Sequence, residues 1–185
     1  MRIGIDCDGV LRDLITCITD TVSETHPQHA DKILTPTSWD WEQWLPFWTD
    51  EETEKYIFEE NYLDFFGPEC PPIDSAVEDW NKLRAWATEN GHELILVSAQ
   101  RPHCIEPPAA WLQRWGFMFD EGHFTKHKWS VDVDILIDDS PEKLDDFDKK
   151  SVNGGKAICM RQTWNTECRN KYTTIDRLAG IIGLV

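Results

Sequence analysis

The stretch IDCDGVLRD (residues 5–13) guides the interpretation of this 185-residue chain. It overlaps RIGID (residues 2–6), a short, partly β-branched run that predicts a buried strand. Asp6 and Asp8 come at the end of that run, and Gly9 beside them allows a tight turn. One carboxylate of such a pair can attack phosphorus, while the other protonates the leaving oxygen and later activates water. The stretch therefore predicts phosphoryl-transfer chemistry at the end of a strand.

Apolar runs alternate with amphipathic segments along most of the chain. Further strands are expected at residues 93–98 (ELILVS), 134–138 (DILID) and 156–160 (KAICM). Helices are expected at residues 10–25, 74–90, 107–115, 141–150 and 174–183. Strands that alternate with helices predict an α/β fold with a parallel sheet and helices on both of its faces.

Three of the expected strands end on reactive side chains. Asp6 and Asp8 follow the first strand, Ser98 ends the second, and Asp138 with Asp139 ends the DILID strand. Ligands of parallel α/β sheets bind beyond the carboxyl ends of the strands. Carboxylates at the ends of apolar strands are costly unless they are paired or bind a metal ion. These side chains are therefore expected to form one site.

Residues 27–72 differ in composition from the rest of the chain. They contain four of the ten tryptophans, six further aromatic side chains and many Pro, Asp and Glu residues. This composition predicts a small helical insertion with aromatic faces. The expected organisation is an α/β core of residues 1–13 and 73–185, with a helical cap formed by residues 14–72.

Charge and hydropathy exclude several classes of protein. The formal net charge of −16 repels polyanions, so a polymeric nucleic-acid partner is not expected. A small phosphorylated substrate is still compatible with this charge if a divalent cation and a few local cations set the potential inside the site. No apolar run approaches the roughly 20 residues of a membrane span, and the start of the chain does not resemble a signal peptide. A cytoplasmic protein without a membrane partner is therefore expected.

Four segments, in their order along the chain, resemble the motifs of the haloacid dehalogenase superfamily. They are IDCDGVL, LILVSAQ (94–100), a lysine at 128 and DILIDD (134–139). The resemblance spans most of the chain and implies a Rossmann-type parallel sheet with a small cap insertion. It also implies that Asp6 is the nucleophile and that Asp8 is the general acid and base.

The same resemblance implies the phosphate and metal contacts. Ser98 would donate to a phosphoryl oxygen, and Lys128 would be a positive clamp. Mg²⁺ would be held by Asp6, by the backbone carbonyl of Asp8 and by Asp138, with Asp139 as an additional or outer acid. Mg²⁺ prefers oxygen ligands and would offset the repulsion between a carboxylate and an anionic phosphate.

Within the superfamily, the chain most resembles the 5′(3′)-deoxyribonucleotidases. The shared features are D-x-D-G-V-L-x-D, a cap insertion directly after it, PPIDSAVEDW before the second helix, and a late L-I-D-D. Lys128 lies ten residues before Asp138, a spacing that resembles this branch, while Lys126 stays an alternative clamp. The branch implies a Mg²⁺-dependent phosphomonoesterase that acts on nucleoside monophosphates through an aspartyl-phosphate intermediate.

Substrate contacts are expected from the cap and from the strand ends. Stacking on an aromatic side chain contributes roughly 1–3 kcal/mol per base, so cap aromatics are candidates to line a base pocket. The candidate substrate-binding residues are Gly9, Ala99, Arg101, Trp39, Trp41, Trp44 and Phe47. The second motif (VSAQRP) and the fourth (DDSPEKL) depart from the family pattern at phosphate and sugar contacts. The substrate is therefore a nucleoside monophosphate or another small phosphorylated metabolite.

Two further alternatives stay open. A receiver-like or other non-catalytic phosphate-binding module also combines acids, a hydroxyl and a lysine on a parallel sheet. In receiver domains, however, the phosphate-accepting Asp lies on a middle strand and the lysine comes last, and an aromatic insertion has no counterpart there. The acidic, aromatic cap can serve to cover the site or to form a homodimer.

Overall fold

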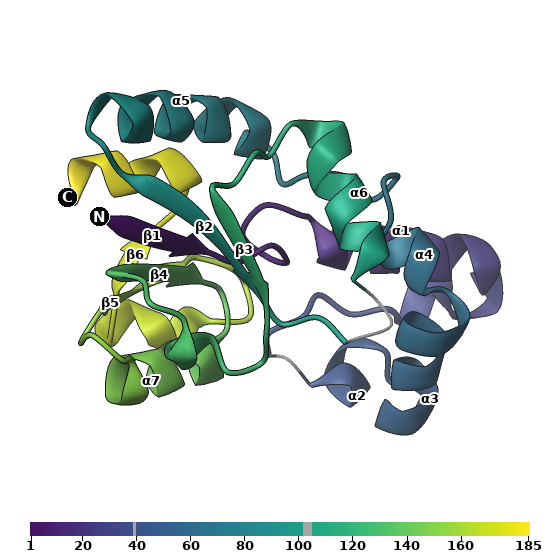
Figure 1. Cartoon of the computed structure of the whole chain (residues 1–185). Coiled ribbons are helices and arrows are strands. Elements are labelled where there is room, and N and C mark those ends of the chain that lie inside the picture. Colours follow the sequence, from purple (N-terminus) through teal and green to yellow (C-terminus); the bar gives the residue numbers. More distant parts are fainter. Residues whose placement is uncertain (39, 102–104) are drawn as a thin grey trace.

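The computed structural model describes residues 1–38, 40–101 and 105–185, and these form a six-stranded parallel sheet flanked by helices (Figure 1). The strands are β1 (Arg2–Ile5), β2 (Glu93–Ser98), β3 (Glu121–Phe124), β4 (Ile135–Asp138), β5 (Lys156–Met160) and β6 (Thr173–Ile175). Their order is β3-β2-β1-β4-β5-β6. β1 is central, and Ile5 lies opposite Leu96 of β2 and Ile137 of β4. The predicted α/β class with a parallel sheet is confirmed.

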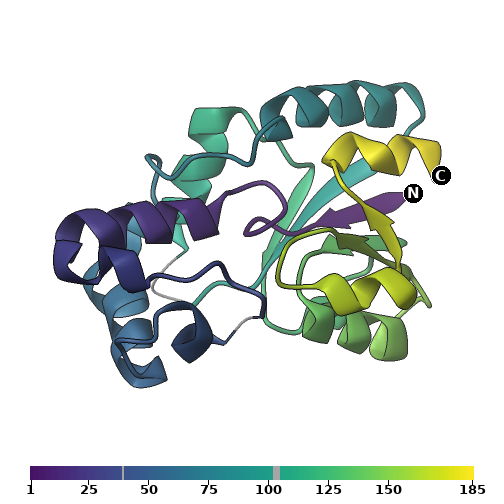
Figure 2. The ribbon, with the colours of Figure 1, turned by 180° about the vertical axis from the view of Figure 1, so that it is seen from behind.

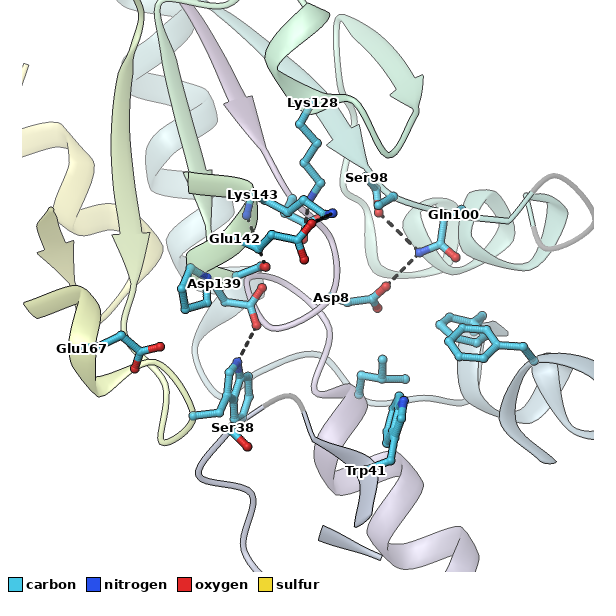
Figure 3. A pocket seen from close by; sticks show the side chains of 18 residues that line it. Asp8, Ser38, Trp41, Ser98, Gln100, Lys128, Asp139, Glu142, Lys143 and Glu167 are labelled. Atoms are coloured by element: carbon cyan, nitrogen blue, oxygen red, sulfur yellow. Dashed lines mark hydrogen bonds and ion pairs between the residues drawn. The ribbon is translucent and has the colours of Figure 1, made fainter. Parts of the chain in front are cut away.

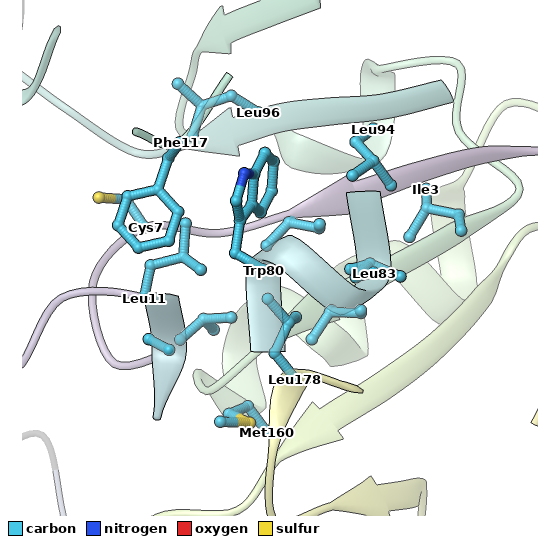
Figure 4. Close-up of a cluster of buried hydrophobic side chains, with 14 of the residues drawn as sticks. Ile3, Cys7, Leu11, Trp80, Leu83, Leu94, Leu96, Phe117, Met160 and Leu178 are labelled. Carbon is cyan, nitrogen blue, oxygen red and sulfur yellow. The ribbon is translucent and has the colours of Figure 1, made fainter. Parts of the chain in front are cut away.

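Helices cover both faces of this sheet. They are α5 (Ala76–Glu89), α6 (Glu106–Trp115), α7 (Pro141–Lys150) and the 3₁₀ helix η6 (Leu178–Gly183). Figure 2 shows η6 alongside α5. In β2, Leu94 and Leu96 pack on one face with Trp80 of α5 (Figure 4), while Ile95 and Val97 face the cluster that contains α7. The strand is therefore apolar on both sides, as is usual for buried parallel strands.

The segment between β1 and α5 forms short helices around an apolar cluster of its own. They are α1 (Leu14–Thr25), the 3₁₀ helix η1 (Pro27–Lys32), α2 (Trp41–Trp44), α3 (Asp50–Lys55), the π-helical turn η2 (Tyr56–Glu60) and α4 (Tyr62–Phe66). Ile18, Trp44, Leu45, Phe65 and Phe66 are at most 2% exposed in this cluster. In Figure 1 these helices lie beside the carboxyl ends of the strands. We call residues 14–72 the cap, and its boundaries stay a prediction.

The two connectors between the sheet and the cap pair with each other. The amide of Asp13 donates to the carbonyl of Pro71 at 2.9 Å, and the amide of Ile73 donates to the carbonyl of Leu11 at 2.8 Å. The chain therefore leaves the core and returns to it through one hydrogen-bonded crossing.

The first helix begins later than predicted. α1 starts at Leu14 rather than at residue 10, because the preceding residues form turns in which two amides bond to the carbonyl of Cys7. Asp13 then caps the helix, and its Oδ1 accepts from the amide of Thr16 at 3.0 Å.

The end of the chain also differs from the predicted helix at residues 174–183. It forms β6, which pairs with β5 through Thr173 and Ile175, followed by η6. The β-branched run before Asp176 favours a strand, and Gly180 with Gly183 disfavours a regular α-helix. The edge strand β3 was not predicted, because its sequence EGHF contains a single apolar side chain.

Candidate active site

The carboxyl ends of three neighbouring strands bring predicted site residues to one edge of the sheet. Asp6 directly follows β1, Ser98 ends β2 and Asp138 ends β4. The amide of Asp6 donates to the carbonyl of Ile137 at 3.0 Å, so the strand ladder still holds this residue. The exposed fractions of Asp6, Ser98 and Asp138 are 6%, 1% and 0%. The sheet thus fixes two carboxylates and a hydroxyl on adjacent strands, largely out of contact with solvent.

Lys128 places a positive charge between two of these carboxylates. It begins the 3₁₀ helix η4 (Lys128–Ser130), and its Nζ lies 2.8 Å from Asp6 Oδ2 and 2.6 Å from Asp138 Oδ2. Burial lowers the pKa of Lys128, but Asp138 and Asp6 raise it more, so the pKa lies above its ordinary value. Lys126 is exposed. Of the two candidate lysines, Lys128 is the one whose ammonium group reaches the strand ends.

The donor set at this edge fits a divalent cation. One carboxylate oxygen from each of Asp6, Asp138 and Asp139 lies within 4.8 Å of the others. Asp6 Oδ1 is buried and has no hydrogen-bond partner among the described residues. Lys128 pairs with Asp6 and Asp138 only, so a divalent cation would balance charge that this lysine leaves unmatched among the three buried carboxylates. Oxygen donors suit hard cations such as Mg²⁺ and Ca²⁺.

The same crowding shifts the acidity of two of these carboxyl groups. Burial raises the pKa of Asp6 to about 7; Lys128 opposes the shift, and Asp138 and Asp8 add to it. Burial, followed by the charges of Asp138 and Asp6, raises the pKa of Asp139 well above its ordinary value. A cation among these carboxylates would favour their charged forms and lower both pKa values.

Asp8 differs from these buried carboxylates because it is partly accessible and held by two donors. Arg12 Nε donates to its Oδ1 at 2.6 Å. Gln100 Nε2 donates to its Oδ2 at 2.8 Å (Figure 3). Gln100 Nε2 also lies 3.4 Å from Ser98 Oγ, which links Asp8 to the end of β2. An oriented carboxylate that solvent and ligands can reach is suited to proton transfer at a reacting group.

Gly9 is needed because the backbone approaches Asp139 closely. Its φ is +71°, and a Cβ at this position would lie 2.2 Å from Asp139 Oδ2. Gln162 Nε2 donates to the carbonyl of Gly9 at 2.7 Å. The glycine therefore lets the loop that carries Asp8 pass over Asp139, and it lies outside the lining of the cavity described next.

A cavity of about 470 Å³ lies over these groups (Figure 3). Its floor includes the strand-end residues Asp6, Asp8, Ser98, Ala99, Gln100, Lys128 and Asp139. Its apolar wall comes from the cap residues Leu14, Trp41, Phe58 and Phe66. Ser38 and the core residues Ser140, Pro141, Glu142, Lys143, Trp164 and Glu167 complete the lining. This volume lies in the range of roughly 300–1,000 Å³ that is typical of small-molecule sites.

The predicted aromatic contacts divide between the cavity and the interior of the cap. Trp41 lines the cavity, but Trp44 is 2% exposed within the apolar centre of the cap. Phe47 stacks on His29 with ring centroids 4.4 Å apart and lies outside the cavity lining. Most aromatic rings of the cap pack with its aliphatic side chains in one apolar cluster, so only a few of them reach the cavity. Trp39 lies outside the described residues.

Arg101 contacts the cap rather than the cavity. Its Nη2 lies 2.9 Å from Glu54 Oε2 of α3, and its guanidinium carbon lies 4.2 Å from the centroid of the Phe58 ring. Arg101 therefore joins the segment after β2 to the cap.

Two residues that hold Asp139 were not predicted. Trp164 Nε1 donates to Asp139 Oδ2 at 2.8 Å, and Asn165 Nδ2 donates to the backbone carbonyl of Asp139 at 2.7 Å. Both follow β5 at the same edge of the sheet, so the reasoning that selected Ser98 would have found this segment too. Phe58 belongs to the aromatic insertion, but composition does not indicate which of its rings face a cavity.

Comparison with known proteins identifies the family of this chain. Residues 1–177 match the model of the family described as 5′ nucleotidase, deoxy (pyrimidine), cytosolic type C protein. A protein of Acanthamoeba polyphaga mimivirus that is named as a 5′(3′)-deoxyribonucleotidase is 26% identical over 150 residues. That alignment covers 77% of this chain and 64% of the viral protein, so this chain spans less than two thirds of the length of its relative.

Solved structures share the fold at low sequence identity. A haloacid dehalogenase-like hydrolase from Streptococcus pneumoniae superposes with a TM-score of 0.64 at 12% identity, covering 99% of this chain and 97% of that one. L-2-haloacid dehalogenase from Xanthobacter autotrophicus, with chloropropionic acid covalently bound, gives a TM-score of 0.62 at 11% identity and the same coverage. The predicted haloacid dehalogenase-like fold is confirmed. In the part of the chain that the structure describes, no helix combines the length and the apolar character needed to cross a bilayer.

Proposed function

Because the chain belongs to the 5′ nucleotidase, deoxy (pyrimidine), cytosolic type C family, a group of phosphoric monoester hydrolases, we propose that it removes the phosphate of nucleoside monophosphates. The observation that carries this proposal is the cavity itself. Its floor holds three carboxylates and a lysine, and its cap wall is apolar and mainly aromatic. The floor suits a phosphate group and the wall suits a flat base.

The proposed reaction has two steps. In the first, a carboxylate oxygen of Asp6 bonds to phosphorus while the ester P–O bond breaks; the electrons of that bond go to the leaving oxygen, which takes a proton from Asp8. In the second, water attacks the phosphorus of the aspartyl phosphate and loses its proton to Asp8, which releases phosphate and the free carboxylate of Asp6. The proposal is supported by Asp6 and Asp8 lining one cavity, and by Asp8 being the more accessible of the two.

Charge on the transferring phosphoryl group would be met by side chains of the floor. Lys128 orients Asp6 through its contact with Oδ2, and Ser98 presents a hydroxyl beside the same floor. Asp6, Asp138 and Asp139 would hold the cation, for which we propose Mg²⁺; when bound, it would neutralise part of the phosphate charge.

The cap would select the substrate. Trp41 and Phe58 are partly exposed in the cavity wall, whereas Phe66 is buried, so one face of a base would pack against Trp41 and Phe58. Leu14 at the start of α1 supplies the aliphatic part of the same wall. The family is described as cytosolic, which supports a cytosolic location for this chain. Formation of a homodimer through the cap stays a prediction.

The test is a phosphate-release assay. Deoxynucleoside, ribonucleoside and sugar monophosphates would each be incubated with Mg²⁺, with a chelator, and with an Asp6→Asn variant. Asp79→Asn is the matched control, because Asp79 is also a buried aspartate but lies outside the cavity, paired with Arg177 at 2.6 Å. We expect Mg²⁺-dependent release from nucleoside monophosphates that Asp6→Asn abolishes and Asp79→Asn retains.

Other outcomes would replace parts of the proposal. Release only from sugar phosphates would retain the mechanism and exclude the nucleotide as substrate. Binding of phosphate without any turnover would favour a non-catalytic phosphate-binding module. Acid quenching during turnover, followed by mass spectrometry of the peptide that contains Asp6, tests for the covalent intermediate.

A further inference from the structure

Arg12 is a fully buried cation beside the accessible carboxylate of the site. Its side chain is 0% exposed, and its Nε lies 2.6 Å from Asp8 Oδ1. The backbone of Arg12 is fixed as well, because its amide donates to the carbonyl of Cys7 at 2.9 Å and its carbonyl accepts from Gly9 at 3.0 Å. The guanidinium is therefore held on Asp8 by a closed turn rather than by a flexible surface side chain.

The remaining contacts of Arg12 lead to the cap. Its Nη1 donates to the backbone carbonyl of Phe66, the last residue of α4, at 2.7 Å. The guanidinium carbon lies 5.1 Å from the centroid of the Phe66 ring and 5.3 Å from that of Trp111 in α6. Arg12 also forms a backbone bridge with Pro72, so it lies where the two connectors between core and cap pair. The Arg12 side chain thus contacts Asp8, the end of α4 in the cap, and α6 of the core.

This arrangement is difficult to attribute to stability alone. A buried guanidinium loses its hydration, and Nη2 of Arg12 has no hydrogen-bond partner among the described residues. Replacing a buried ion pair by apolar groups is often neutral or stabilising. The contacts that Arg12 makes instead fix one oxygen of Asp8 relative to Phe66.

We propose that Arg12 is a positioning residue, which orients the Asp8 carboxylate for proton transfer and makes that orientation depend on the docked position of α4. This inference rests on the proposed function, in which Asp8 passes its proton to the leaving oxygen as the ester P–O bond breaks. Arg12 itself exchanges no proton with the substrate. It holds Oδ1 of Asp8, while Oδ2 accepts from Gln100, which lines the cavity together with Asp8.

The leaving group provides the test. A nucleoside leaves as an alkoxide that needs a proton, whereas p-nitrophenolate leaves with little need for one. We would measure kcat and KM of wild type, Arg12→Met and Arg12→Lys with a nucleoside monophosphate and with p-nitrophenyl phosphate. Methionine retains apolar contact with Phe66 and Trp111, while lysine retains the charge but cannot bond to Asp8 and Phe66 in the same fork geometry. Arg84→Met is the control, because Arg84 pairs with Asp120 at 2.6 Å and lies outside the cavity.

We expect Arg12→Met to lower kcat for the nucleotide on the order of 10²-fold, the lower end of the contribution of a general acid. The loss of kcat in Arg12→Met should be clearly smaller with p-nitrophenyl phosphate than with the nucleotide. For the nucleotide, kcat of Arg12→Lys should lie between those of wild type and Arg12→Met, and kcat of Arg84→Met should equal that of wild type. In an Asp8→Asn variant, adding Arg12→Met should lower kcat little further, because a residue that acts only by orienting the Asp8 carboxylate has no effect once that carboxylate is removed.

Equal losses with both substrates would overturn the inference, because a merely structural role does not distinguish leaving groups. Additive losses of Arg12→Met and Asp8→Asn would overturn it as well. If Arg12→Met does not fold, the same comparison with Arg12→Lys decides. Failure of the proposed function has a different signature: wild type would release phosphate from neither substrate, or Asp8→Asn would be as active as wild type.

Discussion

The floor and the wall of the cavity are built by different forces. The floor contains the charged groups Asp6 and Lys128, and Lys128 also binds the buried Asp138. None of these three side chains is more than 9% exposed, and both ion pairs are at hydrogen-bond distance. The wall consists of rings on cap helices as short as α2 and α4, which are too short to be stable alone and depend on a shared aromatic cluster. The floor is therefore rigid and electrostatic, whereas the wall is apolar and adaptable. Changes in the floor should lower kcat, and changes in the wall should raise KM.

The largest effect is expected for Lys128→Met. The substitution removes the ammonium group between Asp6 and Asp138, so charge on the phosphoryl group loses a buried donor and two carboxylates repel each other. Loss of one such donor typically costs roughly 10²–10³-fold in kcat. Steady-state kinetics at saturating Mg²⁺ would measure it, with Lys126→Met as the exposed control that should behave as wild type. A loss confined to KM would contradict the division between floor and wall.

A smaller and opposite pattern is expected for Trp41→Ala. Loss of the ring from the wall should raise KM for the preferred nucleotide by about 5- to 150-fold, which corresponds to about 1–3 kcal/mol of stacking, with kcat little changed. KM for a sugar phosphate should change less, because it has no base. Phe47→Leu is the control, since Phe47 stacks on His29 outside the cavity lining. A fall in kcat for every substrate would show instead that Trp41 acts on the chemistry.

The buried charges of the floor also predict how pH affects stability. The pKa of Asp6 rises from 3.8 to about 7 on folding, so the folded chain binds this proton more tightly than the unfolded chain. The stabilising contribution of the group is complete below its unfolded pKa and is lost as the pH rises through about 7. Asp139 shifts in the same direction.

The melting temperature of the chelated protein should therefore fall between about pH 5 and pH 8, and Mg²⁺ should raise it more at the upper end of that range. Asp6→Asn should flatten this part of the profile. Asp145→Asn is a control of opposite sign, because hydrogen bonds from Lys171 and Tyr172 lower the pKa of Asp145 to about 2. An Mg²⁺ effect that is equal at both ends would argue against a metal site formed by the buried carboxylates.

The contrast between floor and wall also explains what the sequence could predict. Asp6, Ser98 and Asp138 were found because apolar strands fix where their ends lie, and parallel neighbours end at one edge. Lys128 was selected over Lys126 by its resemblance to a family spacing, and the structure places its ammonium group on Asp6 and Asp138. In both cases a short local pattern determined the position.

In the cap, no local sequence pattern determines where a side chain lies. Trp41 and Trp44 are three residues apart and chemically identical, yet one lines the cavity and the other is buried, because short helices are oriented by the packing of all their rings. The sequence around Arg12 does not indicate the role proposed for it either, because that role depends on a contact with Phe66, which lies 54 residues further along the chain. Long-range contacts of this kind require the three-dimensional structure.

The smallest effect is expected at an exposed contact between the core and the cap, outside the cavity lining. Arg101 and Glu54 have side chains that are 37% and 52% exposed, so their ion pair contributes about 0.2–1 kcal/mol and is screened by salt. Glu54→Gln should therefore raise KM by less than about 5-fold without changing kcat, and added KCl should reduce the difference from wild type. Glu51→Gln, an exposed acid one turn earlier in α3, is the control. The buried bond from Arg12 to Phe66 should be insensitive to the same salt, because solvent does not reach it. If KCl affected variants of the Arg101–Glu54 pair and of the Arg12–Phe66 bond equally, the two contacts would not be independent, and the cap would separate from the core as a unit.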